Sequence, residues 1–117
     1  MKVHDVIPLR SFGEQSFLLH FWPAPEALKN VPLNLISTGL CHVTSPGHAP
    51  AEYRCIFERP GWRDLTNKPV DSVFALVKTS LPYAALATAT YRFSEIGPPI
   101  ARDDALAWQN AASEIGR

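Results

Sequence analysis

Two cysteines and two histidines in the middle of the chain are the residues whose types suit chemistry. Cys41, His42, His48 and Cys55 follow the spacing C-H-x5-H-x6-C, and thiolates with neutral imidazoles are ligands that suit zinc. The spacing lacks the paired C-x2-C or H-x3-H knuckles of structural zinc sites. Cys41 and His42 would also point to opposite faces of a strand, so one of them would turn away from the metal. The pattern favours buried cysteines and loop histidines over a zinc site, and we predict no metal and no other cofactor.

A cysteine nucleophile is the second chemical interpretation, since a thiolate needs a positioned imidazole and a positive environment. His42 directly follows Cys41 and is badly placed to take its proton, and no third group orients the base. A carboxylate pair such as Asp103 and Asp104 is better explained by helix capping. We therefore assign no catalytic residue. A small enzyme, or a metal- or ligand-binding domain that uses Cys41, His42 and His48, is kept as the alternative function.

Aromatic and basic side chains cluster at a turn just after residue 58. The sequence there is Arg59-Pro60-Gly61-Trp62-Arg63, and tryptophan and arginine are enriched at the hot spots of protein interfaces. A tryptophan in a turn can also plug a local core, so both interpretations stay open. As a hypothesis, Arg59, Trp62 and Arg63 form a contact surface for a partner.

The chain is small and its charges are balanced. Its 117 residues fit a single domain, and 11 Lys and Arg residues match 11 Asp and Glu residues. Neither sign forms a run, so we expect no nucleic-acid partner. No segment reaches the roughly 18 apolar residues of a membrane span, and no export signal opens the chain. These features predict a cytoplasmic protein with reduced thiols and no membrane contact.

The prolines, 11 in number, cut the chain into short extended pieces. Each one lacks an N–H and disfavours helix at the residue before it, so few long helices are expected. An almost continuous apolar run over residues 17–22 indicates a strand covered on both faces. Gly39 indicates a bulge or a close backbone approach inside another strand. Strands are predicted over residues 3–9, 15–22, 33–43 and 53–58, with a loop over residues 44–50.

The clearest helical periodicity covers residues 70–81. Apolar side chains fall there at i, i+3, i+4, i+7 and i+11, and Pro69 suits the first turn. Residues 84–96 are ambiguous, because alanines favour helix while threonines and aromatics favour strand; we predict a strand over residues 87–94. Asp103 is a reasonable cap for a short C-terminal helix over residues 104–113. The predicted fold class is α+β, with a mixed or mainly antiparallel sheet of four or five strands, one main packed helix at residues 70–81 and a short C-terminal helix.

Four segments follow one another along the chain: Leu35-Ile36-Ser37-Thr38-Gly39-Leu40, Glu52-Tyr53-Arg54-Cys55, the predicted helix at 70–81 and Ile96-Gly97-Pro98-Pro99-Ile100. In this order they resemble the bacterial suppressor-of-fused (SUFU)-like domain, over about residues 33–100. Cys41 stands where that family has a serine, and Gly39, Leu40, Glu52 and Tyr53 correspond to positions that determine its fold. The resemblance implies an α+β protein-interaction domain, without enzymatic activity, of the kind proposed in bacteria as an immunity protein that neutralises a toxin.

The function that the sequence favours is binding. A small, neutral chain without a catalytic motif suits a non-enzymatic inhibitor or immunity-type protein, bacterial or phage-encoded, that blocks another macromolecule. The expected partner is a protein.

Overall fold

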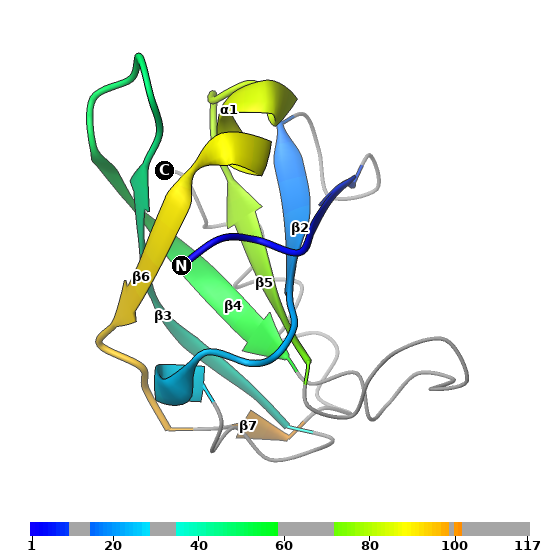
Figure 1. Cartoon of the computed structure of the whole chain (residues 1–117). Helices are drawn as coiled ribbons and strands as arrows, with labels where there is room; N and C mark the ends of the chain where they lie inside the picture. Colours follow the sequence, from blue (N-terminus) through cyan, green and yellow to red (C-terminus); the bar gives the residue numbers. More distant parts are fainter. Residues whose placement is uncertain (10–14, 29–34, 59–71, 99, 102–117) are drawn as a thin grey trace.

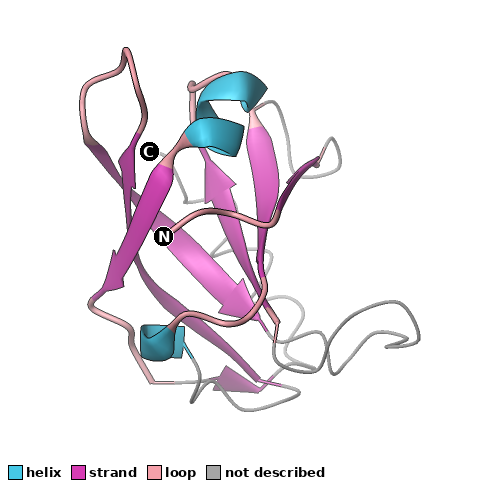
Figure 2. Ribbon diagram, viewed as in Figure 1, coloured by secondary structure: helices cyan, strands magenta, loops and turns pink. Residues whose placement is uncertain are grey.

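The computed structural model of the chain describes residues 1–9, 15–28, 35–58, 72–98, 100 and 101. Within these ranges the protein consists mostly of strands, with one short α-helix and a single 3-10 turn (Figures 1 and 2). The elements are β1 (Asp5–Pro8), β2 (Ser16–Phe21), η2 (Glu26–Leu28), β3 (Leu35–Thr44), β4 (Ala51–Glu58), β5 (Val73–Lys78), α1 (Tyr83–Thr88), β6 (Thr90–Ser94) and β7 (Ile100–Ala101).

All the strands belong to one antiparallel sheet. The order across the sheet is β1-β2-β5-β4-β3-β6, and β7 adds a short pairing to the start of β3. The sheet curls into a half-barrel, so that it has an inner face and an outer face (Figure 1). Because directly paired residues of an antiparallel sheet project to the same side, the register assigns every strand residue to one of these faces.

The first residues of the chain join the two ends of the curled sheet. The backbone of Met1 exchanges two hydrogen bonds with that of Tyr91 on β6, at 2.9 and 2.7 Å. The backbone N–H of His4 then donates to the carbonyl of His20 on β2, at 2.8 Å. Between these points the chain crosses the open side of the half-barrel (Figure 1). The edge of β6 is therefore partly covered by the N-terminal segment, which reduces the length of unpaired strand.

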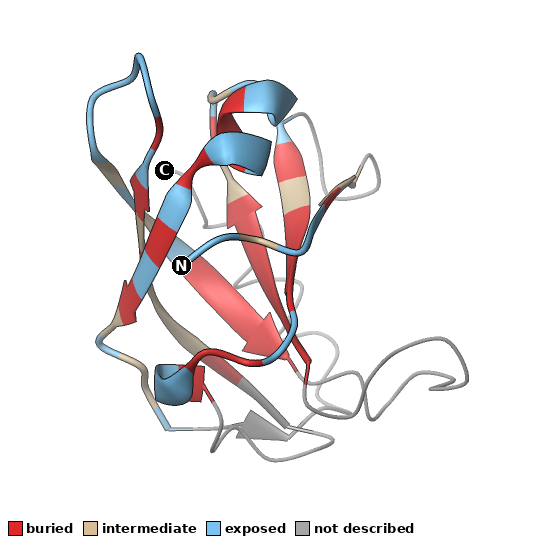
Figure 3. Ribbon diagram, viewed as in Figure 1, coloured by how far each residue is buried: buried red, intermediate tan, exposed pale blue. Residues whose placement is uncertain are grey.

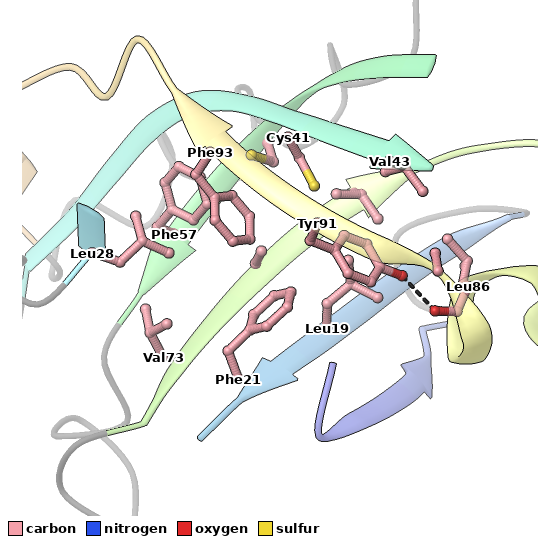
Figure 4. Close-up of a cluster of buried hydrophobic side chains, with 14 of the residues drawn as sticks. Leu19, Phe21, Leu28, Cys41, Val43, Phe57, Val73, Leu86, Tyr91 and Phe93 are labelled. Atoms are coloured by element: carbon pink, nitrogen blue, oxygen red, sulfur yellow. Dashed lines mark hydrogen bonds between the residues drawn. The ribbon is translucent and has the colours of Figure 1, made fainter. Parts of the chain in front are cut away.

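The inner face holds the main hydrophobic core (Figure 4). Its aromatic rings meet edge to face. The ring centroid of Phe21 on β2 lies 5.3 Å from that of Tyr91 and 5.0 Å from that of Phe93. The centroids of Phe93 and of Phe57 on β4 are 5.3 Å apart. These contacts cross the interior from one side of the curl to the other. Edge-to-face pairs contribute about 0.5–1.5 kcal/mol each beyond the area they bury, so they help to hold the sheet curled.

Two short helices close the ends of this core. Leu86 of α1 and Leu28 of η2 are both fully buried, and the two helices lie at opposite ends of the half-barrel (Figures 1 and 2). The hydroxyl of Tyr91 donates a 2.6 Å hydrogen bond to the carbonyl of Leu86, which ties α1 to β6 (Figure 4). No helix in the described ranges is long and apolar enough to cross a membrane.

The outer face is buried over β2, β5 and the end of β4 and exposed toward β6. His20 and Glu58, both buried, lie in the same row as Phe74. Leu18, Ile56, Phe74 and Leu76 form a second buried cluster on β2, β4 and β5. The register places them side by side, since Leu18 and Ile56 both pair with Leu76. Toward β6 the outer face becomes exposed, and the burial of β6 alternates along the strand (Figure 3).

The helix predicted over residues 70–81 is wrong, because the described part of that segment contains strand β5. Val73, Ala75 and Val77 face the inner core, while Phe74 and Leu76 face the outer cluster. A strand buried on both faces is apolar at consecutive positions, so it also satisfies the i, i+3, i+4 spacing of a helix. Its place between β2 and β4 decides the conformation, since both neighbours pair with it.

The α+β fold class is wrong for the same reason. The main packed helix is absent from the described residues, and the sheet is larger than four or five strands. Residues 87 and 88 of the strand predicted over 87–94 belong to α1, and β6 begins only at Thr90. The strands predicted over residues 3–9, 15–22, 33–43 and 53–58 are confirmed, with shorter or shifted ends. The C-terminal helix predicted over residues 104–113 lies outside the described residues.

Candidate functional site

The exposed part of the outer face, over β4, β3 and β6, carries polar and charged side chains on all three strands. It is the reverse side of the core: Cys41 pairs with Tyr53 and Phe93 on the inner face, so the residues that alternate with them face outward. Two rows result, each crossing the three strands. They are Glu52–His42–Arg92 and Arg54–Leu40–Ser94.

His42 lies at the centre and contacts residues on both neighbouring strands. Its Nδ1 lies 3.4 Å from Oε1 of Glu52 on β4, and its Nε2 lies 2.6 Å from Oγ of Ser94 on β6. The imidazole is mostly shielded, with 18% of its side chain exposed, whereas 63% of the Glu52 side chain is exposed. A carboxylate, an imidazole and a hydroxyl thus form one continuous chain of polar contacts.

The carboxylate determines which nitrogen of the neutral imidazole carries the proton. A proton on Nδ1 can be donated toward Glu52, whereas a bare Nδ1 would place a lone pair against a negative charge. In this tautomer Nε2 carries no hydrogen, and it can accept a hydrogen bond from the hydroxyl of Ser94, 2.6 Å away. This is the tautomer in which a histidine acts as a base toward a serine.

Two arginines flank this chain of contacts. Arg54 and Arg92 are exposed, and neither makes an ion pair or hydrogen bond with another described residue. Leu40, in the middle of the second row, is partly buried. The surface therefore has a small apolar centre with free guanidinium groups at its sides.

Hollows open on both sides of Arg54. β4 pairs with β5 only over Ile56–Glu58, so the start of β4 separates from the end of β5. A hollow of about 380 Å³ lies there, and Arg54 and Lys78 supply its positive charge. A smaller one of about 90 Å³ is lined by Thr38, Gly39, Leu40, Arg54 and Glu95.

The two cysteines lie in the core, as the favoured interpretation of the sequence predicted. Cys41 and Cys55 are free thiols, both buried, and Cys55 Sγ lies 3.5 Å from the carbonyl oxygen of Gly39. Burial, and then the neighbouring Cys41, raise the pKa of Cys55 well above its ordinary value. A nucleophilic cysteine needs a lowered pKa and an open approach, so Cys55 has neither property.

The four residues of the considered zinc site do not converge. Cys41 and His42 face opposite sides of β3, as predicted. His48 lies exposed in the turn between β3 and β4, where its Nδ1 is 3.3 Å from the carbonyl of Pro46. Among the residues that the structure describes, no group of three His, Cys, Asp or Glu side chains is placed to hold a metal ion.

Among the described residues that the sequence offered as candidates for chemistry, only His42 belongs to this surface. Arg59, Trp62 and Arg63, the predicted partner contacts, lie outside the described residues. Ser94 and Glu52 were not predicted as functional residues. Glu52 is the second residue of β4, and the alternation of side chains along this strand is a pattern that could have placed it on one face with Arg54. Ser94 lies 52 residues from His42, and no local sequence pattern links the two.

Comparisons with known protein families, with curated proteins and with solved structures found no match. The resemblance to the SUFU-like domain stays a prediction.

Proposed function

We propose that the protein is a binding domain that docks another protein on the outer face of β4, β3 and β6. Its specific role would be that of an inhibitor or immunity-type protein that covers a surface of its partner. The observation that carries the proposal is the pair Arg54 and Arg92, exposed at the two sides of this face without an ion pair to any described residue.

Free arginines on a strand face are well suited to recognition. A guanidinium group binds a carboxylate through two parallel hydrogen bonds, and it is weakly hydrated for a cation. Leu40, partly buried in the middle of the second row, adds the apolar centre that protein interfaces combine with a polar rim. Lys78 in the adjoining hollow adds a further positive charge. Glu52, 63% exposed, adds one negative charge to the same face. The partner surface that fits therefore carries carboxylates opposite Arg54 and Arg92 and an apolar side chain opposite Leu40.

Charge reversal tests this proposal. The partner is first isolated by cross-linking the tagged full chain in cells of its source and identifying the adduct by mass spectrometry. Its affinity is then measured for the unchanged protein and for Arg54→Glu and Arg92→Glu. Each variant is expected to weaken binding by about 2 kcal/mol, roughly 30-fold in Kd.

The control is Ala84→Glu, which adds a negative charge at an exposed position of α1. It should bind within about threefold of the unchanged protein, because α1 carries none of the residues of the two rows. Equal affinity of Arg54→Glu, Arg92→Glu and the unchanged protein, with all three folded, would remove this face as the docking surface.

A further inference from the structure

We propose that Ser94 is an activated nucleophile that accepts an acyl group from an ester, with His42 as its general base and Glu52 as the residue that positions the imidazole. This inference goes beyond the proposed docking function and does not depend on it. It rests on side chains other than the two arginines.

The polar contacts have the order that nucleophilic catalysis requires. A serine hydroxyl is a weak nucleophile until a neighbouring base takes its proton as it attacks. The 2.6 Å separation between Ser94 Oγ and His42 Nε2 is within the range of such a transfer. The Glu52 carboxylate, 3.4 Å from Nδ1 on the opposite side of the ring, holds the tautomer and stabilises the imidazolium that forms.

The backbone holds Ser94 at a bend rather than in the middle of a strand. Ser94 is the last residue of β6, and Glu95 directly after it has a left-handed backbone with φ of 54°. A non-glycine residue rarely adopts this conformation, and such residues are concentrated at functional sites. The chain therefore turns immediately after the serine, and Ser94 itself is half-buried.

The hollows near the serine and the histidine bound the acyl group. His42 and Glu52 line a hollow of about 330 Å³. A smaller hollow of about 90 Å³ is lined by Leu40, which pairs with Ser94, and by Glu95, which follows it. A short acyl group fits either space.

The reaction with an ester balances without any further reagent. Ser94 Oγ bonds to the carbonyl carbon while its proton passes to Nε2 of His42. The bond from that carbon to the alkoxy oxygen then breaks, and the alcohol leaves with the proton. Water attacks the acyl-serine by the same route, which releases the acid and restores the hydroxyl.

A serine-directed fluorophosphonate tests the nucleophile directly. Ser94 Oγ displaces fluoride from phosphorus, which adds one phosphonyl group and releases hydrogen fluoride. The full chain is incubated with the reagent at neutral pH, and the adduct is counted by intact mass and located by peptide mass spectrometry. We expect one adduct, on Ser94, and slow release of p-nitrophenol from p-nitrophenyl acetate by the same protein.

Four variants separate chemistry from structure. Ser94→Ala should remove the adduct, and His42→Gln should slow labelling by about 100-fold or more, the usual contribution of a general base. Glu52→Gln should slow it by about threefold to tenfold, because an exposed carboxylate is screened by solvent. Glu52→Asp should restore part of the loss, which a purely structural role of Glu52 does not predict.

Ser80→Ala is the matched control, since Ser80 is exposed and the polar contacts of His42 are with Ser94 and Glu52; its labelling should equal that of the unchanged protein. Thermal unfolding of every variant shows that it is folded. The inference is overturned if Ser94 gains no adduct, or if folded His42→Gln is labelled as fast as the unchanged protein. Either result would leave the polar contacts as a structural cross-strand cluster and would not affect the docking proposal.

Discussion

A Cβ atom on Gly39 would lie 2.8 Å from Cε2 of Phe57, which is too close for two carbon atoms that are not bonded to each other. The same atom would lie 3.2 Å from the carbonyl oxygen of Ser94 and 3.3 Å from Cα of Ile96. Gly39 thus lets the phenyl ring and the chain that leaves β6 both pack against β3. The close backbone approach predicted for this glycine is confirmed.

Gly39→Ala should therefore destabilise the protein by about 1–3 kcal/mol, the usual cost of forcing an extra methyl group into a packed site. The rigid ring of Phe57 and the backbone of Ser94 have little room to move away. Urea unfolding of the two proteins measures the difference.

Gly97→Ala is the control for this prediction. An added Cβ there would meet only Thr38, at 3.5 Å and 3.7 Å, which is ordinary contact. Its stability should stay within about 0.5 kcal/mol of the unchanged protein. Equal stabilities of Gly39→Ala and Gly97→Ala would contradict the packing described for β3 and β4.

Phe74→Ala should cost about 3–5 kcal/mol, because the ring is 1% exposed and its removal leaves a cavity in the outer cluster. The ring also stacks on His20, with centroids 4.7 Å apart. Tyr83→Ala, at a side chain that is 50% exposed, should change stability by less than about 1 kcal/mol. Denaturant melts decide this, and a loss below 1 kcal/mol for Phe74→Ala would mean that this face of β5 is open to solvent.

Tyr91→Phe removes the hydroxyl that donates to the carbonyl of Leu86 inside the core, at 2.6 Å. The carbonyl of Leu86 would stay buried without its donor, so we expect the free energy of unfolding to fall by about 1–2 kcal/mol. Tyr83→Phe is the matched control, since its exposed hydroxyl makes no hydrogen bond to a described residue. Thermal unfolding of both variants tests the difference, and equal midpoints would show that the bond between β6 and α1 contributes nothing.

Alkaline pH should destabilise the protein. Burial raises the pKa of Cys55 in the folded state, while an unfolded cysteine ionises near about pH 8.5. A raised folded pKa means that the folded protein holds the proton more tightly, so its stability is intact below about pH 8.5 and falls as the pH rises above it. Burial also raises the pKa of Tyr91, which extends the decline above about pH 10, where an unfolded tyrosine ionises.

The pH effect is measured by urea unfolding at intervals between pH 7 and pH 10.5. Cys55→Ala should be less stable at pH 7 but should lose less stability between pH 8.5 and 10 than the unchanged protein. Native protein should also react slowly with a thiol reagent at neutral pH. Rapid modification of Cys55 in the folded state would show that the thiol is open to solvent.

The local sequence was sufficient for most of the strands and for part of the site. Prolines and apolar runs located β1 to β4, because a strand needs little more than a short apolar segment between turn residues. Alternation along a strand also placed Cys41 and His42 on opposite faces, since it depends only on backbone geometry. These properties are local, so the residues themselves determine them.

Only the tertiary structure decided the conformation of β5 and the membership of the polar surface. The run Val73-Phe74-Ala75-Leu76-Val77 is compatible with helix or strand, and the pairing of β5 with β2 and β4 selects the strand. Ser94 meets His42 because β6 pairs with β3 in a register that spans 52 residues of sequence. Register depends on the burial of a whole face at once, and a contact of that kind has no signature in the residues that lie on either side of it.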